Sequence, residues 1–523
     1  MMNGLGLSIL PIYFLTTILV GWLTRRHARN ANDFLNASRS LPLWIVSIAF
    51  LAVNCGALEV MGLSAMAAEF GVQAFQFYWI GAIPGIVFLA LWMMPVYFKS
   101  EVRSIPDFLR LRYGPEVQIV NAIALALTML MLAGISLYAI GQALHAIFGL
   151  QFSASVFISA MVVCMYVLLG GVRATIYNEV LQLAVMLIGL IPLFFRTWRI
   201  GLEAARGEGM AAHLWTAMPN VSNVASLDKV GTIAGLGFVL SFSYWGTDFV
   251  LIQRALAARN TVDARKVPLL AGFGKLAFSF LVVLPGLAAR VLIPHIGTAV
   301  RFDEALPSLM RIFYGPVFLG FGLTALASSL MSALAANLSG FTAVWTQDIY
   351  RRWLRPNRTE RHYSLMGYSA TAFAVLGSMA VSSVSFYFGN LMEHIQLLFS
   401  LFSAPFFAIF LLGMLSQRID MRGALIGLVT GIFASAGHHM LVAVHIFHYS
   451  SIMNADFHAA IWGFIAAILS AVIFSLRTDD GAQQQPSPLH FVWNIGFAGS
   501  AAGVALMAIT LLTACGLLNY LWR

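Results

Sequence analysis

Residues 276–289 read LAFSFLVVLPGLAA, an uncharged run inside an apolar stretch, 267–293, that is long enough to cross a bilayer. Similar apolar runs recur at 83–98, 156–169 and 459–474. Hydrophobic residues make up 60% of the chain and charged residues only 10%, so a soluble protein of this composition would expose far too much apolar surface. Helices satisfy their own backbone hydrogen bonds in lipid. The sequence therefore predicts an all-α polytopic membrane protein.

We count about fourteen such transmembrane stretches between residues 7 and 521. They predict five segments, which we list in order. Residues 1–42 are an extra N-terminal helix and loop, 43–195 a first repeat, 196–230 an extracellular loop, 231–415 a second repeat, and 416–523 three C-terminal helices. The polar tract at 479–488 is a linker between the last two apolar stretches.

The distribution of basic residues predicts the topology. If the N-terminus is outside and the spans alternate, most of the 30 Lys and Arg residues fall in loops on one side, including the loop at 351–361. This is the positive-inside bias of membrane proteins. The net charge of +9 is thus explained by topology, and no nucleic-acid partner is expected. We expect both termini outside, in the cytoplasmic (inner) membrane of a bacterium, and we leave the oligomeric state open.

Two apolar stretches are interrupted by glycine and polar residues near their middle. Residues 49–62 read AFLAVNCGALEVMG, and residues 241–248 read SFSYWGTD. Glycine weakens a helix by about 1 kcal/mol relative to alanine, and an unwound segment frees carbonyl groups that can bind a cation. For either stretch alone, ordinary helix packing is an equally good explanation. The two lie five spans apart, which is the spacing that a five-plus-five inverted repeat needs, so together they predict a transporter.

Small and hydroxyl residues form one face of the apolar stretch 312–347. Ser329, Ser332 and Ala333 recur there at helical spacing, together with further alanines and a glycine. Close packing of helices explains such a face by itself. The alternative is that Ser329 and Ser332 are oxygen ligands of a hard cation.

Polar and ionisable residues inside apolar stretches are costly and mark candidate sites. We select Glu179, Lys275 and Gln396 on this ground, and note that Glu393 and His394 lie where a membrane interface would tolerate them. The histidines between 438 and 458 lack a compact metal-ligand motif. We interpret them as interfacial and leave their role open.

Several motifs occur in the order and spacing of one transporter family. They are Asp33-Phe34 with Ser38-Arg39-Ser40-Leu41 and Trp44, Ser104-Ile105-Pro106-Asp107-Phe108-Leu109 with Arg112-Tyr113-Gly114, Gly170-Gly171 with Glu179-Val180-Leu181-Gln182, Tyr244-Trp245-Gly246 with Gln253-Arg254-Ala255-Leu256, Lys275 with Val283-Leu284-Pro285-Gly286, Asp348-Ile349-Tyr350, and Phe410-Leu411-Leu412-Gly413. Over about residues 5–475 the chain resembles the sodium:solute symporter family, which includes the sodium–glucose cotransporters. The resemblance implies a leucine-transporter-like five-plus-five inverted repeat, with one extra helix before it and three after, and cation-coupled symport by alternating access.

The resemblance also implies a cation site. Carried over by position, its ligands are the carbonyl groups of Ala52 and Cys55 and the hydroxyl groups of Ser329 and Ser332. Ala333 stands where members often have another hydroxyl, so this chain lacks one ligand. Na⁺ is the expected coupling ion, and no other cofactor is expected.

A second cation or proton site is implied at Glu179, because some members have an acidic residue there. Its hydroxyl partners are replaced here by Ala335 and Ala336. Proton coupling through Glu59, Glu179 or Asp248 therefore remains the rival of sodium coupling, since a buried carboxyl group can titrate near neutral pH.

The resemblance places the solute between the two interrupted stretches. The implied solute-binding residues are Asn54, Glu59, Gln76, Tyr78, Trp79, Ser241, Tyr244, Lys275 and Gln396. Tyr244 would be the inner gate, and Glu59 and Lys275 would be coupled indirectly, through water or solute. Glu59, Tyr78 and Ser241 differ from sugar-transporting members, so we disfavour simple sugars. The aromatic and acidic residues favour a solute with an amine and an apolar part.

The sequence gives less support to other classes of function. The chain has no zinc motif, nucleophile arrangement or nucleotide-binding loop, so an enzyme is not expected. A transporter-like sensor that acts through a partner protein, and an uncoupled transporter of the same fold, remain as alternatives.

Overall fold

The computed structural model describes residues 41–100, 105–167, 172–206, 214–215, 226–476 and 502–522, with a few positions between residues 8 and 19. These residues are almost entirely helical and form isolated bridges but no β-strand, which confirms the predicted all-α class. Most of the predicted N-terminal segment 1–42, about half of the loop 196–230 and the linker at 479–488 lie outside the described residues.

The helices before residue 210 are α3 (Leu43–Asn54), α4 (Ala57–Phe70), η2 (Gly71–Ala74), α5 (Phe75–Trp79), α6 (Ile83–Phe88), η3 (Leu89–Met93), α7 (Met94–Ser100), α8 (Ile105–Tyr113), α9 (Pro115–Phe148), α10 (Phe152–Val167) and α11 (Val172–Arg206). Those up to residue 415 are η4 (Gly231–Leu240), α12 (Ser241–Thr247), α13 (Phe249–Leu256), α14 (Thr261–Leu292), η5 (Phe302–Glu304), α15 (Ala305–Phe313), α16 (Pro316–Ala343), η6 (Val344–Leu354), α17 (Glu360–Val384), η7 (Ser385–Tyr387), α18 (Leu391–Leu398), η8 (Phe399–Ser403) and α19 (Ala404–Leu415). The last are α20 (Met421–Ala443), α21 (Ile452–Leu476) and α23 (Ala502–Leu521).

Ten helical segments of the described residues are long and apolar enough to cross a membrane, so the chain is polytopic. The predicted total of about fourteen spans is not tested by this number. Some spans are divided into short helices, as α3 and α4 are, and others lie partly outside the described ranges.

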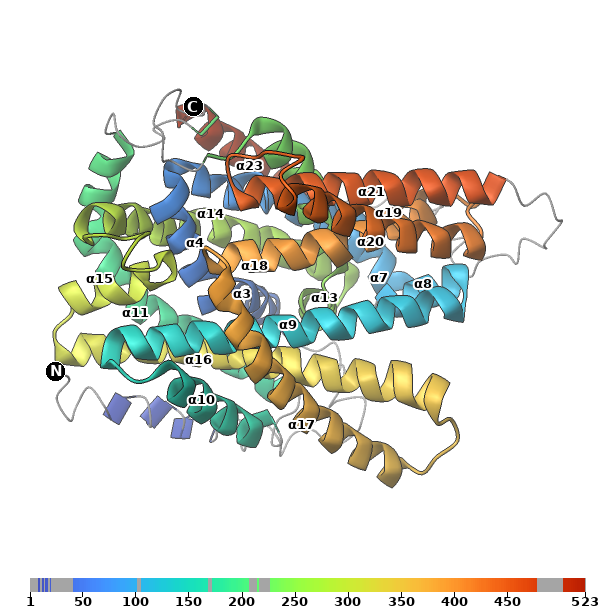
Figure 1. The fold of residues 1–523 in the computed structure, drawn as a ribbon, viewed down its shortest axis with the longest axis horizontal. Helices are drawn as coiled ribbons and strands as arrows, with labels where there is room; N and C mark the ends of the chain where they lie inside the picture. Colours follow the sequence, from blue (N-terminus) through green and yellow to red (C-terminus); the bar gives the residue numbers. More distant parts are fainter. Residues whose placement is uncertain are drawn as a thin grey trace.

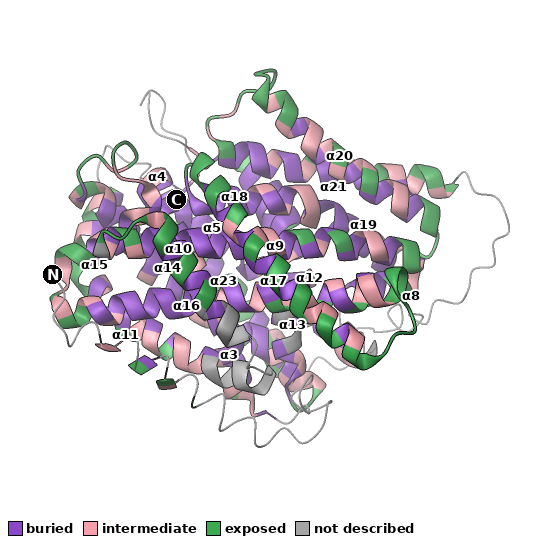
Figure 2. Ribbon diagram, turned by 60° about the horizontal axis from the view of Figure 1, so that its bottom comes forward, coloured by how far each residue is buried: buried purple, intermediate pink, exposed green. Residues whose placement is uncertain are grey.

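The long helices α9, α11, α14 and α16 form the centre of the molecule. Helices α9 and α16 run side by side, and α14 packs against α3, α4 and α11 (Figure 1). In α9 and α14, 67% of the most apolar segment is buried, against 28% in α20 and 22% in α23. Figure 2 shows the same contrast, with buried residues concentrated along α16 and exposed residues along α20. The exposed apolar side chains of the outer helices are the surface that a lipid bilayer would cover.

Both predicted interruptions are present and lie against the central helices. The first separates α3 from α4 at Cys55 and Gly56, and the second separates α12 from α13 at Asp248. Helices α3, α4 and α13 all contact α14, and α12 contacts α6 and η4. Two of the π-helical segments, η4 and η8, pack near the second break, which is typical of functional sites in helical proteins.

Candidate functional site

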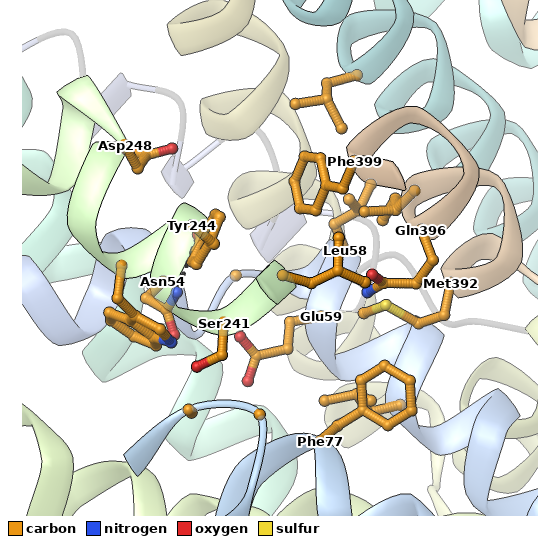
Figure 3. A pocket seen from close by; sticks show the side chains of 18 of the residues that line it. Asn54, Leu58, Glu59, Phe77, Ser241, Tyr244, Asp248, Met392, Gln396 and Phe399 are labelled. Atoms are coloured by element: carbon orange, nitrogen blue, oxygen red, sulfur yellow. Dashed lines mark hydrogen bonds between the residues drawn. The ribbon is translucent and has the colours of Figure 1, made fainter. Parts of the chain in front are cut away.

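A cavity of about 240 Å³ lies where the two interrupted spans meet. This is slightly below the usual size of ligand pockets, about 300–1,000 Å³, so its ligand is small. Figure 3 shows the cavity from close by. Its polar lining residues are Asn54, Glu59, Tyr78, Ser136, Ser241, Tyr244, Asp248, Lys275, Asn337 and Gln396.

The first break leaves backbone carbonyl groups without helical partners. Helix α3 ends at Asn54, the Cys55 amide donates to the Leu51 carbonyl at 2.7 Å, and Gly56 is extended with φ −76° and ψ 166°. The last carbonyls of a helix that stops here have no intrahelical donor. A Cβ atom at Gly56 would lie 3.5 Å from Ser329 Oγ, so the break faces α16 closely.

The second break is held by a cap. Asp248 is extended, with φ −70° and ψ 113°, and its carboxylate accepts a hydrogen bond from the Leu251 amide at 2.9 Å. An aspartate at this position satisfies one of the free amides that begin α13. Helix α6 approaches α12 closely because residue 85 is glycine. A Cβ atom there would lie 2.7 Å from Trp245 Cδ1, which is closer than real side chains come.

Glu59 and Lys275 form a direct ion pair at the cavity. Lys275 Nζ lies 2.6 Å from Glu59 Oε2, and it also donates to Asn54 Oδ1. The same ammonium group lies 5.3 Å from the ring centroids of both Tyr78 and Trp245, which is cation–π range. The predicted indirect coupling through water or solute was therefore wrong. The α4 and α14 backbones pack closely enough for the two side chains to meet.

Tyr244 continues this polar chain toward the second break. Asn54 Nδ2 donates to the Tyr244 hydroxyl at 2.9 Å, so one amide side chain connects Lys275 to Tyr244. The Tyr244 ring lies 5.7 Å from the ring of Phe399 in η8. Figure 3 shows Tyr244 between Asp248 on one side and Glu59 on the other. Tyr244 thus separates the part of the cavity that holds Glu59 from the part that holds Asp248.

Four buried polar atoms that belong to lining residues have no hydrogen-bond partner. They are Glu59 Oε1, Tyr78 Oη, Ser241 Oγ and Gln396 Oε1, of which Glu59 and Tyr78 lie close to each other without the geometry of a good hydrogen bond. A buried polar atom without a partner is costly and calls for an explanation. All four residues were predicted to bind solute, and a bound solute would supply the missing hydrogen bonds.

Two other predicted solute residues do not line the cavity. Trp79 donates to Ser279 Oγ at 3.3 Å and stacks on Phe75 at 4.7 Å, and Gln76 is buried outside the lining. Phe77 and Tyr78 face the cavity instead. At 100° per residue, positions 76 and 79 lie on the opposite side of this helix from 77 and 78, so one helix cannot present all four to one site.

Sequence reasoning missed most of the apolar lining and two polar residues on the central helices. The apolar residues include Leu58, Met392 and Phe399, and the polar ones are Ser136 in α9 and Asn337 in α16. Asn337 lies one helical turn from Ala333, which also lines the cavity. The small-residue face of α16 was therefore a signal for Asn337. The apolar residues carry no comparable signal, because every span is apolar.

The sequence pattern that defines the sodium:solute symporter family matches residues 34–431. The chain belongs to this family. It is 25% identical to a sodium/glucose cotransporter of Vibrio parahaemolyticus, over 98% of each chain. It is 27% identical to the sodium/glucose cotransporter 1 of Ovis aries, over 82% of this chain and 70% of that one.

A solved structure confirms the predicted leucine-transporter-like fold of this symporter. It is the substrate-bound, outward-open state of a Na⁺-coupled sialic acid symporter, with a TM-score of 0.72 and 15% identity, and the match covers 91% of this chain and 98% of that chain. The symporter is thus a multi-pass membrane protein that couples a small solute to Na⁺, and it is not an enzyme.

Three of the residues implied as cation ligands lie at the first break. Ser329 lies beside Gly56, and Ser332 follows one turn later on α16. Ala52 and Cys55 are at the end of α3, where the helical hydrogen bonds stop. Na⁺ prefers such oxygen ligands, and the described residues hold no group of three or more His, Cys, Asp or Glu side chains that would favour a transition metal.

Glu179 lies in a different environment from the cavity. Both of its carboxylate oxygens accept from Arg254, at 2.5 Å from Nη2 and 3.2 Å from Nε, and both side chains are buried. A bidentate pair of this kind satisfies the carboxylate. The predicted role of Glu179 as a second cation or proton site remains a prediction that this contact does not favour.

Sequence patterns assigned no role to Glu393, His394 or the histidines between 438 and 458. In the structure these side chains make local contacts. Glu393 accepts from the Gly389 amide at 2.8 Å, and His394 hydrogen-bonds to Ser385 and stacks on Phe388 at 4.2 Å. Several histidines between 438 and 458 share contacts. His438 hydrogen-bonds to Tyr449, the Tyr449 ring lies 5.0 Å from that of His458, and the His439 ring lies 6.0 Å from that of His438. His439 also hydrogen-bonds to Ser400, and His458 to Asp228. In the part of the chain that the structure describes, they form no group that could hold a metal ion.

Proposed function

We propose that Na⁺ and a small solute bind at the two helix breaks and cross the membrane together by alternating access. One observation carries this proposal: the interruptions of α3/α4 and α12/α13, far apart in the sequence, meet at one cavity that is lined by charged, polar and apolar side chains. In transporters built from inverted repeats, discontinuous helices near the middle of the bilayer bind the solute and the coupling ion.

The proposal assigns a role to each group of residues. Glu59, Ser241 and Gln396 bind the solute through the oxygen atoms that lack partners. The cation lies between the carbonyls at the end of α3 and the hydroxyls of α16, and Tyr244 is the inner gate. Ala333 offers no oxygen, so water or a further carbonyl completes the coordination of Na⁺.

The decisive experiment is uptake into proteoliposomes that contain the full-length chain. A radiolabelled solute library is offered with an inward Na⁺ gradient, with an inward proton gradient, and with choline in place of Na⁺. We expect accumulation above equilibrium only with the Na⁺ gradient. Accumulation driven by the proton gradient, with no effect of Na⁺, would show that sodium coupling is wrong and that a carboxyl group carries the proton.

A binding measurement supports the transport experiment before a solute is known. A ligand that binds only the folded state stabilises it by its mass-action term. We expect the purified chain to melt at a higher temperature in NaCl than in KCl or choline chloride of equal ionic strength. Equal melting temperatures in all three salts would contradict a specific Na⁺ site.

We also propose the cytoplasmic membrane of a bacterium as the location, with the N-terminus outside and the loop 351–361 in the cytoplasm. The basic residues of that loop support this orientation. A single cysteine introduced at position 356 should react with a membrane-impermeant thiol reagent only after the cells are opened. Labelling of this cysteine in intact cells would show that the loop is external and that the orientation is the opposite of the one proposed.

A further inference from the structure

The charged residues that line the cavity are Glu59, Asp248 and Lys275, within the part of the chain that the structure describes. Asp248 lies beyond Tyr244, as Figure 3 shows, and its carboxylate caps the start of α13. The positive end of a helix dipole partly compensates a carboxylate in that position. The electrostatics on the other side of Tyr244, where the unpartnered polar atoms lie, therefore depend on Glu59 and Lys275.

Most of the hydrogen-bonding capacity of Lys275 is already used, so it is a poor binding partner for an anionic solute. Its ammonium group donates to Glu59 and Asn54, and it lies 5.3 Å from the ring centroids of Tyr78 and Trp245. A lysine ammonium has three donors. Two are used by oxygen acceptors, and the two aromatic rings also stabilise its charge.

Lys275 neutralises the charge of Glu59, but one carboxylate oxygen of Glu59 still lacks a hydrogen bond. Oε2 lies 2.6 Å from Lys275 Nζ, whereas Oε1 is buried and has no partner. Gln396 Oε1 is a second unpartnered acceptor, and Ser241 Oγ is an unpartnered hydroxyl. These atoms are suited to a solute that donates hydrogen bonds through hydroxyl or N–H groups.

The opposite side of the cavity is mostly apolar. Figure 3 shows Glu59 and Ser241 on one side, and Phe77, Met392 and Phe399 on the other, where Gln396 is the polar residue beside Met392. A ligand that fits both sides has a polar end with hydrogen-bond donors and an apolar end. A net charge on that ligand would have no free counter-charge next to Glu59 and Lys275, and burying an unpaired charge is costly.

We propose that the Glu59–Lys275 pair acts as a charge filter, so that the site accepts net-uncharged solutes with hydrogen-bond donors at one end and an apolar part at the other. The pair rejects cations and anions alike because each of its members already has its counter-ion. This inference rests on the proposed solute site and names the class of solute. It also replaces the amine that the sequence favoured with an uncharged donor.

The test compares molecules that share a skeleton and differ in charge. The first series is 2-phenylethanol (neutral), 2-phenylethylamine (cation) and phenylacetate (anion), and the second is cyclohexylmethanol, cyclohexylmethylamine and cyclohexanecarboxylate. Each is titrated against the full-length chain in NaCl while the melting temperature is followed. We expect at least one neutral member to bind, and its charged analogues to require at least tenfold higher concentrations. Equal or tighter binding of a charged member, or no binding by either neutral member, overturns the proposal.

Variants of the pair should change the preference in opposite directions. Glu59→Gln leaves Lys275 uncompensated, so the anionic member should gain at least tenfold relative to the neutral one. Lys275→Met leaves Glu59 uncompensated, so the cationic member should gain instead. Glu360→Gln makes the same chemical change at the exposed pair of Glu360 and Arg351, and should leave the order of binding unchanged.

A double variant covers the case in which a single charge in the cavity prevents folding. Glu59→Gln combined with Lys275→Met removes both charges and should keep the preference for neutral members. A gain of an anion or a cation in this double variant overturns the proposal. Binding is measured without any gradient. Failure of Na⁺-driven uptake, with the charge order intact, would therefore refute the coupling and leave the charge filter in place.

Discussion

Two buried ion pairs of this symporter differ in how completely they satisfy their carboxylates. Glu179 and Arg254 form a bidentate pair in which both oxygens accept hydrogen bonds, and each side chain is 5% exposed. Glu59 and Lys275 share one contact, Glu59 Oε1 is unpartnered, and the glutamate is 14% exposed. Only the second pair lines the cavity.

The difference indicates how a buried charge can be assigned to structure or to function. In a pair such as Glu179–Arg254, both carboxylate oxygens already accept hydrogen bonds, so neither is available to a ligand. This pair stabilises the packing of α11 against α13. An unsaturated pair retains an oxygen whose hydrogen bond must come from elsewhere, and in a cavity the solute is the available donor. The following predictions test this distinction, from the largest expected effect to the smallest.

Glu179→Gln should lower the free energy of unfolding by about 3–5 kcal/mol, because it leaves the Arg254 charge buried without its counter-ion. Thermal unfolding of the purified chain measures the loss. The matched control is Glu360→Gln, whose exposed pair should contribute less than about 1 kcal/mol. If Glu179→Gln is as stable as wild type but loses its dependence on Na⁺, Glu179 is a cation site and the distinction fails.

Asp303, in η5 outside the spans, is a second saturated carboxylate. Its oxygens accept from the Leu391 amide at 2.8 Å and the Tyr138 hydroxyl at 3.1 Å, and burial raises its pKa from 3.8 to about 6. The folded state therefore binds the proton more tightly than the unfolded state does. Stability from this group is fully present below about pH 4 and is lost as the pH rises through about 6, by up to about 3 kcal/mol.

The measurement is unfolding as a function of pH in wild type and in Asp303→Asn. The variant should lose the decline between pH 4 and 6, while solute preference stays as in wild type. An unchanged pH profile in the variant would show that another group is responsible, and a changed solute preference would place Asp303 with the functional carboxylates.

Ser332→Ala tests the proposed Na⁺ site, where the structure leaves oxygen atoms available to a ligand. A hydroxyl bonded to a charged group contributes about 1.5–3 kcal/mol, so the apparent affinity for Na⁺ should fall roughly 10- to 100-fold. Ala333→Ser should raise it by adding an oxygen. Ser339→Ala, at an exposed position of the same helix, is the control and should not change it. The Na⁺ dependence of the melting temperature is the readout, and identical curves for Ser332→Ala and Ser339→Ala would contradict this site.

Tyr244→Phe should have the smallest effect. It removes the hydrogen bond from Asn54 Nδ2 but keeps the ring against Phe399. One such bond contributes about 0.5–1.5 kcal/mol, so solute should leave preloaded proteoliposomes up to about tenfold faster. Tyr244→Ala removes the ring as well and should accelerate release further. Tyr387→Phe, at an 87% exposed tyrosine, is the control. Release from Tyr244→Ala at the wild-type rate would exclude a gate at this position.

The fold was more predictable than the site. Residues 49–62 and 241–248 show their breaks through local composition, since glycine and polar residues weaken a helix wherever it lies. Gln76 and Trp79 were placed in the cavity because the resemblance was carried over by position, although helical periodicity separates them from Phe77 and Tyr78. The apolar lining by Met392 and Phe399 could not be read, because in a membrane protein apolar residues occur on every face.

The sequence by itself determined that the chain is a helical membrane protein, where two spans are interrupted, and which family it resembles. These properties follow from local composition, periodicity and the order of motifs along the chain. Only the tertiary structure decided that Glu59 pairs directly with Lys275, and that Glu179 forms an ion pair with Arg254. Each pair joins residues far apart in sequence, 216 positions in the first case and 75 in the second. Which charges meet depends on how the packed helices are turned toward one another, and no local pattern contains that information.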